Sequence, residues 1–229
     1  MTIRRWACAA SVGPGVATMV AVGASAGAPA LPPPQFGKSV DIGLISGVVI
    51  VRPAAGRSFR LGAQDHNIPV GSEIDTRRGA VDLRSARDPG HASAASSATG
   101  PIQDAHFSRG LFRVVQRTNL GGLTTLDLVL SDNIRRVCGL VSAAATPGHL
   151  SSRVLQTLHA SDNGGSFRTR GRYSASTVRG TIWDTTDRCD GTLTVVHRGT
   201  VEVDDFSLRR TITVHAGHRY LAKAPVPAG

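Results

Sequence analysis

The chain has 229 residues, a formal net charge of +10 and only 4% aromatic residues. Its length allows one domain or two small ones, and its core must rely on Val, Leu and Ala because large aromatic side chains are few. The positive charge is spread along the sequence and is not interleaved with aromatics, which argues against specific nucleic-acid binding. Short β-branched runs separated by Gly and Pro favour an all-β fold, an antiparallel sandwich or roll of short strands with long loops.

The first 26 residues have the pattern of a secretory signal peptide. Arg4 and Arg5 precede an acid-free apolar run, and Ala24-Ser25-Ala26 forms a small-residue cleavage site. The Gly13-Pro14-Gly15 interruption disfavours a membrane-spanning helix. We therefore expect cleavage after Ala26 and a protein that is secreted or associated with the cell envelope, without a transmembrane span after cleavage.

The remaining chain is expected to hold one folded domain. Residues 27–41 are rich in proline and predict an extended spacer, residues 42–222 a single β domain, and residues 223–229 a tail. Without the signal peptide, the chain has 24 basic and 16 acidic residues, and Lys38 and Lys223 are its only lysines. Arginine suits binding of phosphate or carboxylate, although a GC-rich genome would give the same composition.

Strand patterns are clearest in the two ends of the chain. In the first half they cover Ile42–Arg52, Phe59–Leu61, Ile74–Thr76 and Val81–Leu83, and Ser85–Pro101 is expected to be a long surface loop. A hairpin is expected around Ser108-Arg109-Gly110, and Leu126, Leu128 and Leu130 alternate as in a strand. Residues 131–166 give no clear prediction.

The most ordered pattern runs from Phe167 to Val203. In the segment Phe167–Tyr173, Arg168, Arg170 and Arg172 alternate with less polar residues, which predicts one strand with the arginines together on its outer face. This stripe is a candidate site for an anionic polymer. Asp184, Asp187 and Asp190 follow on the next segment, where a polar run ending in Asp190-Gly191 predicts a chain reversal, and they are expected to neutralise the stripe if it is purely structural.

Several segments together resemble the FecR-like domain, a β-rich extracytoplasmic module of bacteria. Gly47–Val51 resembles its G-x-V-x-V strand, and Pro69–Thr76 its P-x-G-x-x-[IV]-x-T segment. Ser174–Thr181 (SASTVRGT) resembles a second-half motif, with Trp183 where the family usually has Phe. Gly199–Val203 and Val214–Gly217 resemble its closing pattern.

The resemblance implies a secreted, non-catalytic β domain. The best-known FecR proteins are sigma-factor regulators that join a cytoplasmic head, a membrane span and a periplasmic receiver. Neither the head nor a credible span is evident in this sequence, so transmembrane signalling is not carried over.

Cys138 and Cys189 are the only cysteines that follow the signal. A pair of cysteines in an exported protein predicts a disulfide. Two free thiols or a metal-binding pair is the alternative, which no Cys-x-x-Cys spacing supports.

No catalytic or metal site is predicted, and no cofactor. His215 and His218, with His197 nearby in sequence, are candidate metal ligands, but they lie at a strand end without an acid at a helpful spacing. No G-x-S-x-G elbow supports a hydrolase triad built from Asp65, His66 and a serine. Asp204-Asp205 lacks the Asp-x-Asp spacing of a calcium loop.

Two functions from different classes remain. The first is a FecR-like module that binds or senses a cell-envelope component, such as an anionic envelope polymer or an envelope protein. The second is an enzyme acting on a cell-wall polymer through a site that the sequence does not reveal. Clustered acids in a pocket would favour the enzyme.

Overall fold

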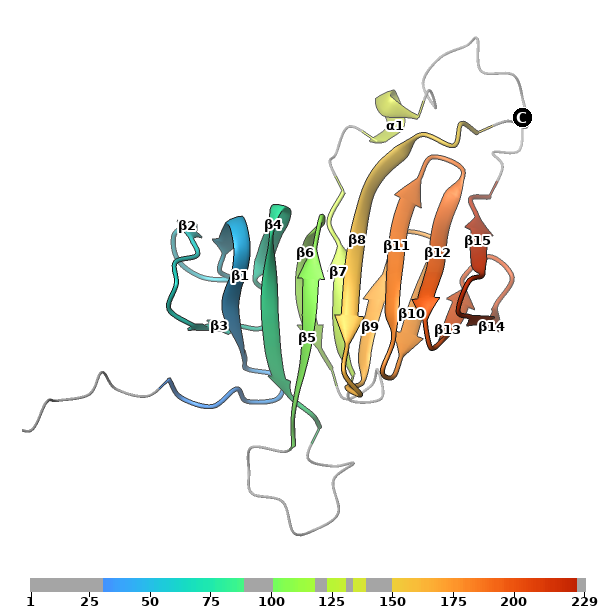
Figure 1. Ribbon diagram of the computed structural model, residues 1–229. Coiled ribbons are helices and arrows are strands. Elements are labelled where there is room, and N and C mark those ends of the chain that lie inside the picture. Colours follow the sequence, from blue (N-terminus) through green and yellow to red (C-terminus); the bar gives the residue numbers. More distant parts are fainter. Residues whose placement is uncertain (1–30, 89–100, 118–122, 131–133, 139–149, 226–229) are drawn as a thin grey trace, which may run out of the picture. The chain divides into compact units, whose positions relative to one another are not determined.

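The computed structural model describes residues 31–88, 101–117, 123–130, 134–138 and 150–225 (Figure 1). The expected signal peptide, residues 1–26, lies outside these ranges. Residues 31–229 form one compact unit, and its described part is almost entirely β-structure, which confirms the expected fold class. No helix in the described ranges is long and apolar enough to cross a membrane.

The first seven strands are β1 (Ser39–Arg52), β2 (Phe59–Arg60), β3 (His66–Pro69), β4 (Glu73–Ala86), β5 (Ile102–Ser108), β6 (Leu111–Gln116) and β7 (Thr124–Leu128). The short helix α1 (Ile134–Val137) follows. The later strands are β8 (Val154–Asp162), β9 (Phe167–Arg170), β10 (Ser174–Val178), β11 (Ile182–Arg188), β12 (Gly191–Arg198), β13 (Thr200–Asp205), β14 (Arg210–His215) and β15 (Arg219–Lys223).

The strands hydrogen-bond into one mixed sheet in the order β14-β13-β10-β9-β7-β6-β4-β5-β8-β11-β12-β15, and β1 pairs with β2, β3 and β4. β7 and β9 run parallel, and the other described pairs are antiparallel. The strands β8, β11 and β12 lie side by side in Figure 1.

The sheet folds back on itself at β4. The start of this long strand pairs with β6, and its second half pairs with β5, so that β5 and β6 leave β4 in different layers. The expected hairpin at Ser108–Gly110 is therefore wrong: these residues carry the chain from one layer to the other. Gly47 and Gly79 face each other at the bend, where a Cβ on Gly79 would lie 2.6 Å from the carbonyl oxygen of Ser46.

Hydrogen bonds between strands that are not neighbours join the two layers. The hydroxyls of Thr169 on β9 and Thr185 on β11 lie 2.6 Å apart, and Trp183 Nε1 donates to Thr169 Oγ1. Ser176 on β10 and Thr194 on β12 make a similar contact at 2.8 Å. All these side chains are buried, so the core contains paired hydroxyls as well as the expected aliphatic residues.

Aromatic side chains fill the centre between the layers. The ring centroid of Phe107 lies 5.5 Å from that of Phe112 and 5.8 Å from that of Phe167, and all three are fully buried. These contacts join β5 to β6 and β9. Three of the aromatic side chains thus meet where the two layers pack together.

Two strands extend beyond their expected ends. β1 begins at Ser39, within the segment expected to be a spacer, because Val40 already packs in the core. β4 continues to Ala86, and Ser85 is buried where it contacts Thr124, so the expected loop starts later. The rest of that loop, residues 89–100, lies outside the described residues.

Candidate functional site

A pocket of about 250 Å³ opens on the outer face of the layer that contains β7 and β9. It is lined by Val115, Arg117, Thr125, Asp127, Arg168, Arg170 and Phe206. Three of these side chains are arginines and one is a carboxylate. The pocket therefore carries net positive charge.

Strand alternation explains which residues reach the pocket. On β9, Phe167 and Thr169 point inward and are fully buried, which places Arg168 and Arg170 on the outer face. β7 runs parallel to β9 with Thr125 opposite Arg168 and Asp127 opposite Arg170. The register thus brings two guanidinium groups beside a hydroxyl and a carboxylate.

The two arginines have different partners. Arg168 Nη2 donates to Asp204 Oδ2 at 2.8 Å, and the Arg168 side chain is only 19% exposed. The guanidinium carbon of Arg170 lies 5.5 Å from the ring centroid of Phe206, a distance typical of a cation–π contact. Arg168 is therefore fixed against an acid, whereas the Arg170 side chain makes no hydrogen bond within the described ranges and can donate to another group.

Three buried polar atoms of the pocket residues have no hydrogen-bond partner among the described residues. They are Thr125 Oγ1, Asp127 Oδ1 and Arg168 Nε. Leaving a buried polar atom unpaired costs on the order of 1–3 kcal/mol. Such atoms together in a pocket can be satisfied by a bound ligand, with Arg168 Nε as a donor and Asp127 Oδ1 as an acceptor.

Arg172, the third residue of the expected stripe, does not lie in this pocket. β9 ends at Arg170, because the next backbone N–H groups leave the strand ladder: Arg172 N donates to Asp187 Oδ1 and Tyr173 N to Thr192 Oγ1. The Arg172 guanidinium lies over the Tyr173 ring instead. The expectation of one strand with three aligned arginines was therefore wrong at its last residue.

The acids expected to neutralise the stripe also have other partners. Asp190 forms an ion pair with Arg188, and Asp184 with Arg109. Asp187 is 1% exposed, and burial raises its pKa although Thr192 and the backbone of Arg172 donate hydrogen bonds to it. Asp204, whose spacing does not fit a calcium loop, is the acid that pairs with Arg168.

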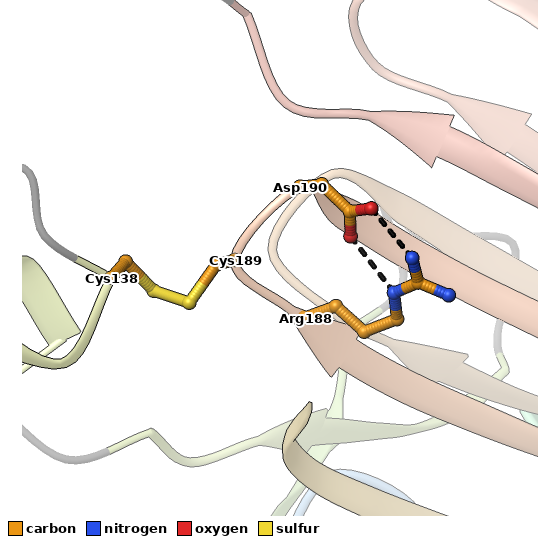
Figure 2. Close-up of a disulfide and its surroundings, with 4 residues drawn as sticks. All are labelled: Cys138, Arg188, Cys189 and Asp190. Atoms are coloured by element: carbon orange, nitrogen blue, oxygen red, sulfur yellow. Dashed lines mark hydrogen bonds and ion pairs between the residues drawn. A yellow bond between two sulfur atoms is a disulfide. The ribbon is translucent and has the colours of Figure 1, made fainter. Parts of the chain in front are cut away.

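The expected bond between Cys138 and Cys189 is confirmed. The two residues form a disulfide with a Cα–Cα distance of 5.3 Å, which joins the residue after α1 to the turn between β11 and β12 (Figure 2). Arg188 and Asp190 flank Cys189 and make two hydrogen bonds to each other. The reversal predicted for this polar run is only two residues long, because Asp184–Arg188 belong to β11.

The histidines weighed as metal ligands do not gather in one place. His215 Nδ1 lies 3.2 Å from Thr200 Oγ1, and His218 Nδ1 lies 3.1 Å from the carbonyl oxygen of Ala216. His197 instead contacts Asp184, as does His159 on β8. Sequence reasoning missed His159 because its segment gave no clear prediction.

Sequence reasoning also missed Arg117, Thr125, Asp127 and Phe206 as pocket residues. The alternation of Leu126 and Leu128 indicated a strand, so it could have placed Thr125 and Asp127 on one face. It could not have indicated that this strand runs parallel to Phe167–Arg170. The chain matches no protein-family model, no curated protein and no solved structure.

Proposed function

We propose that this protein is an exported binding module that holds an anionic group of a cell-envelope polymer in the pocket between β7 and β9. The FecR-like motifs of the sequence suggest the same class of protein, a non-catalytic extracytoplasmic β domain. The chemistry of the pocket supplies the ligand class.

The observation that carries the proposal is the set of unpaired buried atoms beside Arg170. A phosphate or carboxylate accepts two parallel hydrogen bonds from a guanidinium group. Arg168 and Arg170 both line the pocket, and Arg168 Nε is buried without a hydrogen-bond partner among the described residues. An anionic group that reached these donors would therefore satisfy groups that have no partner among the residues that the structure describes.

The hydrogen-bond acceptors of the pocket residues restrict the chemical class of the ligand further. Asp127 and Thr125 line the same pocket, and Asp127 Oδ1 and Thr125 Oγ1 have no hydrogen-bond partner in the described part of the chain. A carboxylate oxygen accepts hydrogen bonds from hydroxyl or ammonium groups. A simple inorganic anion would leave Asp127 unsatisfied and close to its own charge. An anion attached to a hydroxylated unit fits better, as in an acidic sugar or a polyol phosphate.

The proposal is tested by measuring the affinity of the purified protein for poly(glycerol phosphate) and for polygalacturonate, with neutral dextran as the negative control. The first two polymers distinguish a phosphate from a carboxylate ligand. We expect one of them to bind and Arg117→Gln with Arg170→Gln to weaken that binding by about tenfold or more, since two charge-assisted contacts are lost.

Arg172→Gln is the matched control, because Arg172 belongs to the same segment but lies outside the pocket. We expect it to change the affinity little and the double variant to flatten the salt dependence. Failure of both polymers to bind, or equal losses in the control and the double variant, would overturn the proposal.

A further inference from the structure

A second group of chemically active side chains lies in the other layer. His159 on β8, Asp184 on β11 and His197 on β12 come from three neighbouring strands. His159 Nδ1 lies 2.6 Å from Asp184 Oδ1, and His197 Nε2 lies 2.9 Å from Asp184 Oδ2. The carboxylate is thus held between two imidazoles.

The sheet positions each of these residues. Asp184 is the register partner of His159 across the antiparallel pair of β11 and β8. Between β11 and β12, Ile182 pairs with Arg198 and the next residue, Trp183, pairs with Val196. His197 on β12 is skipped in this register and is therefore the extra residue of a β-bulge. A bulge redirects a side chain, and here it accompanies a histidine that reaches Asp184 although Asp184 pairs with Val195.

The donor set is one that transition metals use. One ligand atom from each residue lies within 4.8 Å of the other two. A metal bound at about 2.0–2.2 Å from each imidazole nitrogen and carboxylate oxygen needs these atoms somewhat closer together. Small side-chain rotations suffice, because His159 and His197 are 33% and 46% exposed while the three strands fix their backbones.

Arg109 competes for the same carboxylate. Its Nη2 lies 2.7 Å from Asp184 Oδ1, from a residue at the corner between β5 and β6 that is 55% exposed and has a φ of 68°. Burial raises the pKa of Asp184, but hydrogen bonds with His159 and His197 and the charge of Arg109 outweigh it and hold the pKa well below its usual range. The Asp184 carboxylate is thus shared by two imidazoles and one guanidinium group.

We propose that His159, Asp184 and His197 bind a divalent transition-metal ion of the zinc type, and that Arg109 neutralises Asp184 when the metal is absent. Two imidazoles and a carboxylate suit zinc and its late first-row neighbours and do not suit magnesium or calcium. Three protein ligands leave a fourth position for water or for a donor group of a partner. This site is in the layer opposite the arginine pocket and does not depend on the function proposed for that pocket.

The experiment is a titration of the purified, oxidised protein, free of any polyhistidine tag, with Zn²⁺ in competition with a chromophoric chelator. We expect one zinc ion per chain, unaffected by an excess of Mg²⁺. Loss of even an outer-shell partner lowers metal affinity by roughly 10–100-fold, so His159→Gln and His197→Gln should each weaken binding at least tenfold. His218→Gln is the matched control, since the exposed His218 imidazole lies beside the carbonyl oxygen of Ala216 and is not one of the three proposed ligands.

Arg109→Gly separates a metal site from a structural ion-pair network. Glycine adopts the φ of Arg109 without strain, so the variant should fold, and removing the competing cation should tighten zinc binding. A protein that binds no zinc, or that binds it equally well in the His159→Gln/His197→Gln double variant, would overturn the proposal. As a readout that needs no variant, substoichiometric Zn²⁺ should shift the imidazole NMR signals of His159 and His197 before those of His215 and His218, and the reverse order would also contradict it.

Discussion

Thr125 and Arg168 are register partners across the parallel pair β7–β9, both line the same pocket, and each has a buried polar atom without a hydrogen-bond partner among the described residues. Each buried polar atom that has no hydrogen bond lowers the stability of the free protein. A ligand that contacts both atoms removes that cost. The pair therefore links the stability of the fold to the proposed binding function.

The first prediction follows from this link. Thr125→Val removes the unpaired hydroxyl, so the free energy of unfolding should stay the same or rise by about 1 kcal/mol, while the affinity for the anionic polymer should fall. Urea unfolding and the polymer-binding assay measure the two effects. Thr169→Val is the control, and it should lower the free energy of unfolding. The Thr169 hydroxyl accepts a hydrogen bond from Trp183, and the variant loses that bond.

The disulfide gives a prediction about stability alone. Cys138 and Cys189 are 51 residues apart, and closing a loop of this length stabilises a protein by about 4 kcal/mol in the chain-entropy description. Replacing both cysteines with serine should lower the free energy of unfolding by that order. A reducing agent should lower the free energy of unfolding of the wild type by the same amount and leave that of the double variant unchanged. If the reducing agent also destabilises the double variant, the loss of stability does not come from this disulfide.

Two nearby aspartates should respond to pH in opposite directions. The pKa of Asp184 is lowered from its ordinary value of 3.8, so the stability it contributes is present above that value and is lost as the pH falls below it. In the presence of a chelator, Asp184→Asn should therefore destabilise the protein at pH 7 and have a smaller effect near pH 3.

Burial raises the pKa of Asp187 above 3.8, against the hydrogen bonds from Thr192 and the backbone of Arg172. Its contribution is then fully present below 3.8 and is lost as the pH rises through the raised pKa. The stability of Asp187→Asn relative to the wild type should increase between about pH 4 and pH 7. Urea unfolding at several pH values checks both slopes, and parallel slopes for the two variants would be inconsistent with this assignment.

Gly171 is expected to be essential where the chain leaves β9. A Cβ there would lie 2.5 Å from Asp187 Oδ1 and 2.6 Å from Thr192 Cγ2. Gly171→Ala should lower the free energy of unfolding by about 1–3 kcal/mol, as overpacking does. Gly62→Ala is the matched control, because a Cβ at Gly62 meets no atom within 4 Å. Thermal unfolding should separate the two variants, and equal stabilities would contradict the proposed close contact.

Local patterns predicted much of the fold. The alternation of Phe167 and Thr169 with Arg168 and Arg170 correctly indicated a strand and its two faces, because a buried face requires period-two spacing. The cysteine pair was predictable because it is the only one that follows the signal-like segment. The strand prediction depends on residues that are close in sequence, and the disulfide prediction depends on there being one possible pair of cysteines after the signal-like segment.

What could not be predicted depends on contacts between distant segments. The end of β9 is determined by Asp187 and Thr192, whose side chains replace the strand partners of Arg172 and Tyr173. The parallel pairing that builds the pocket joins β7 to β9 with β8 placed elsewhere in the sheet. No local propensity encodes such a register, so the pocket acids and hydroxyls became visible only in the fold.

The most direct test of the proposed binding site is the NMR signal of the Arg168 Nε–H group during titration with short fragments of whichever anionic polymer binds. This donor is buried and has no hydrogen-bond partner in the described part of the protein. The account predicts that its signal shifts on binding while that of the Arg172 Nε–H group stays in place. A shift confined to Arg172, or saturable binding that leaves the Arg168 signal unchanged, would contradict the assignment of the pocket as the ligand site.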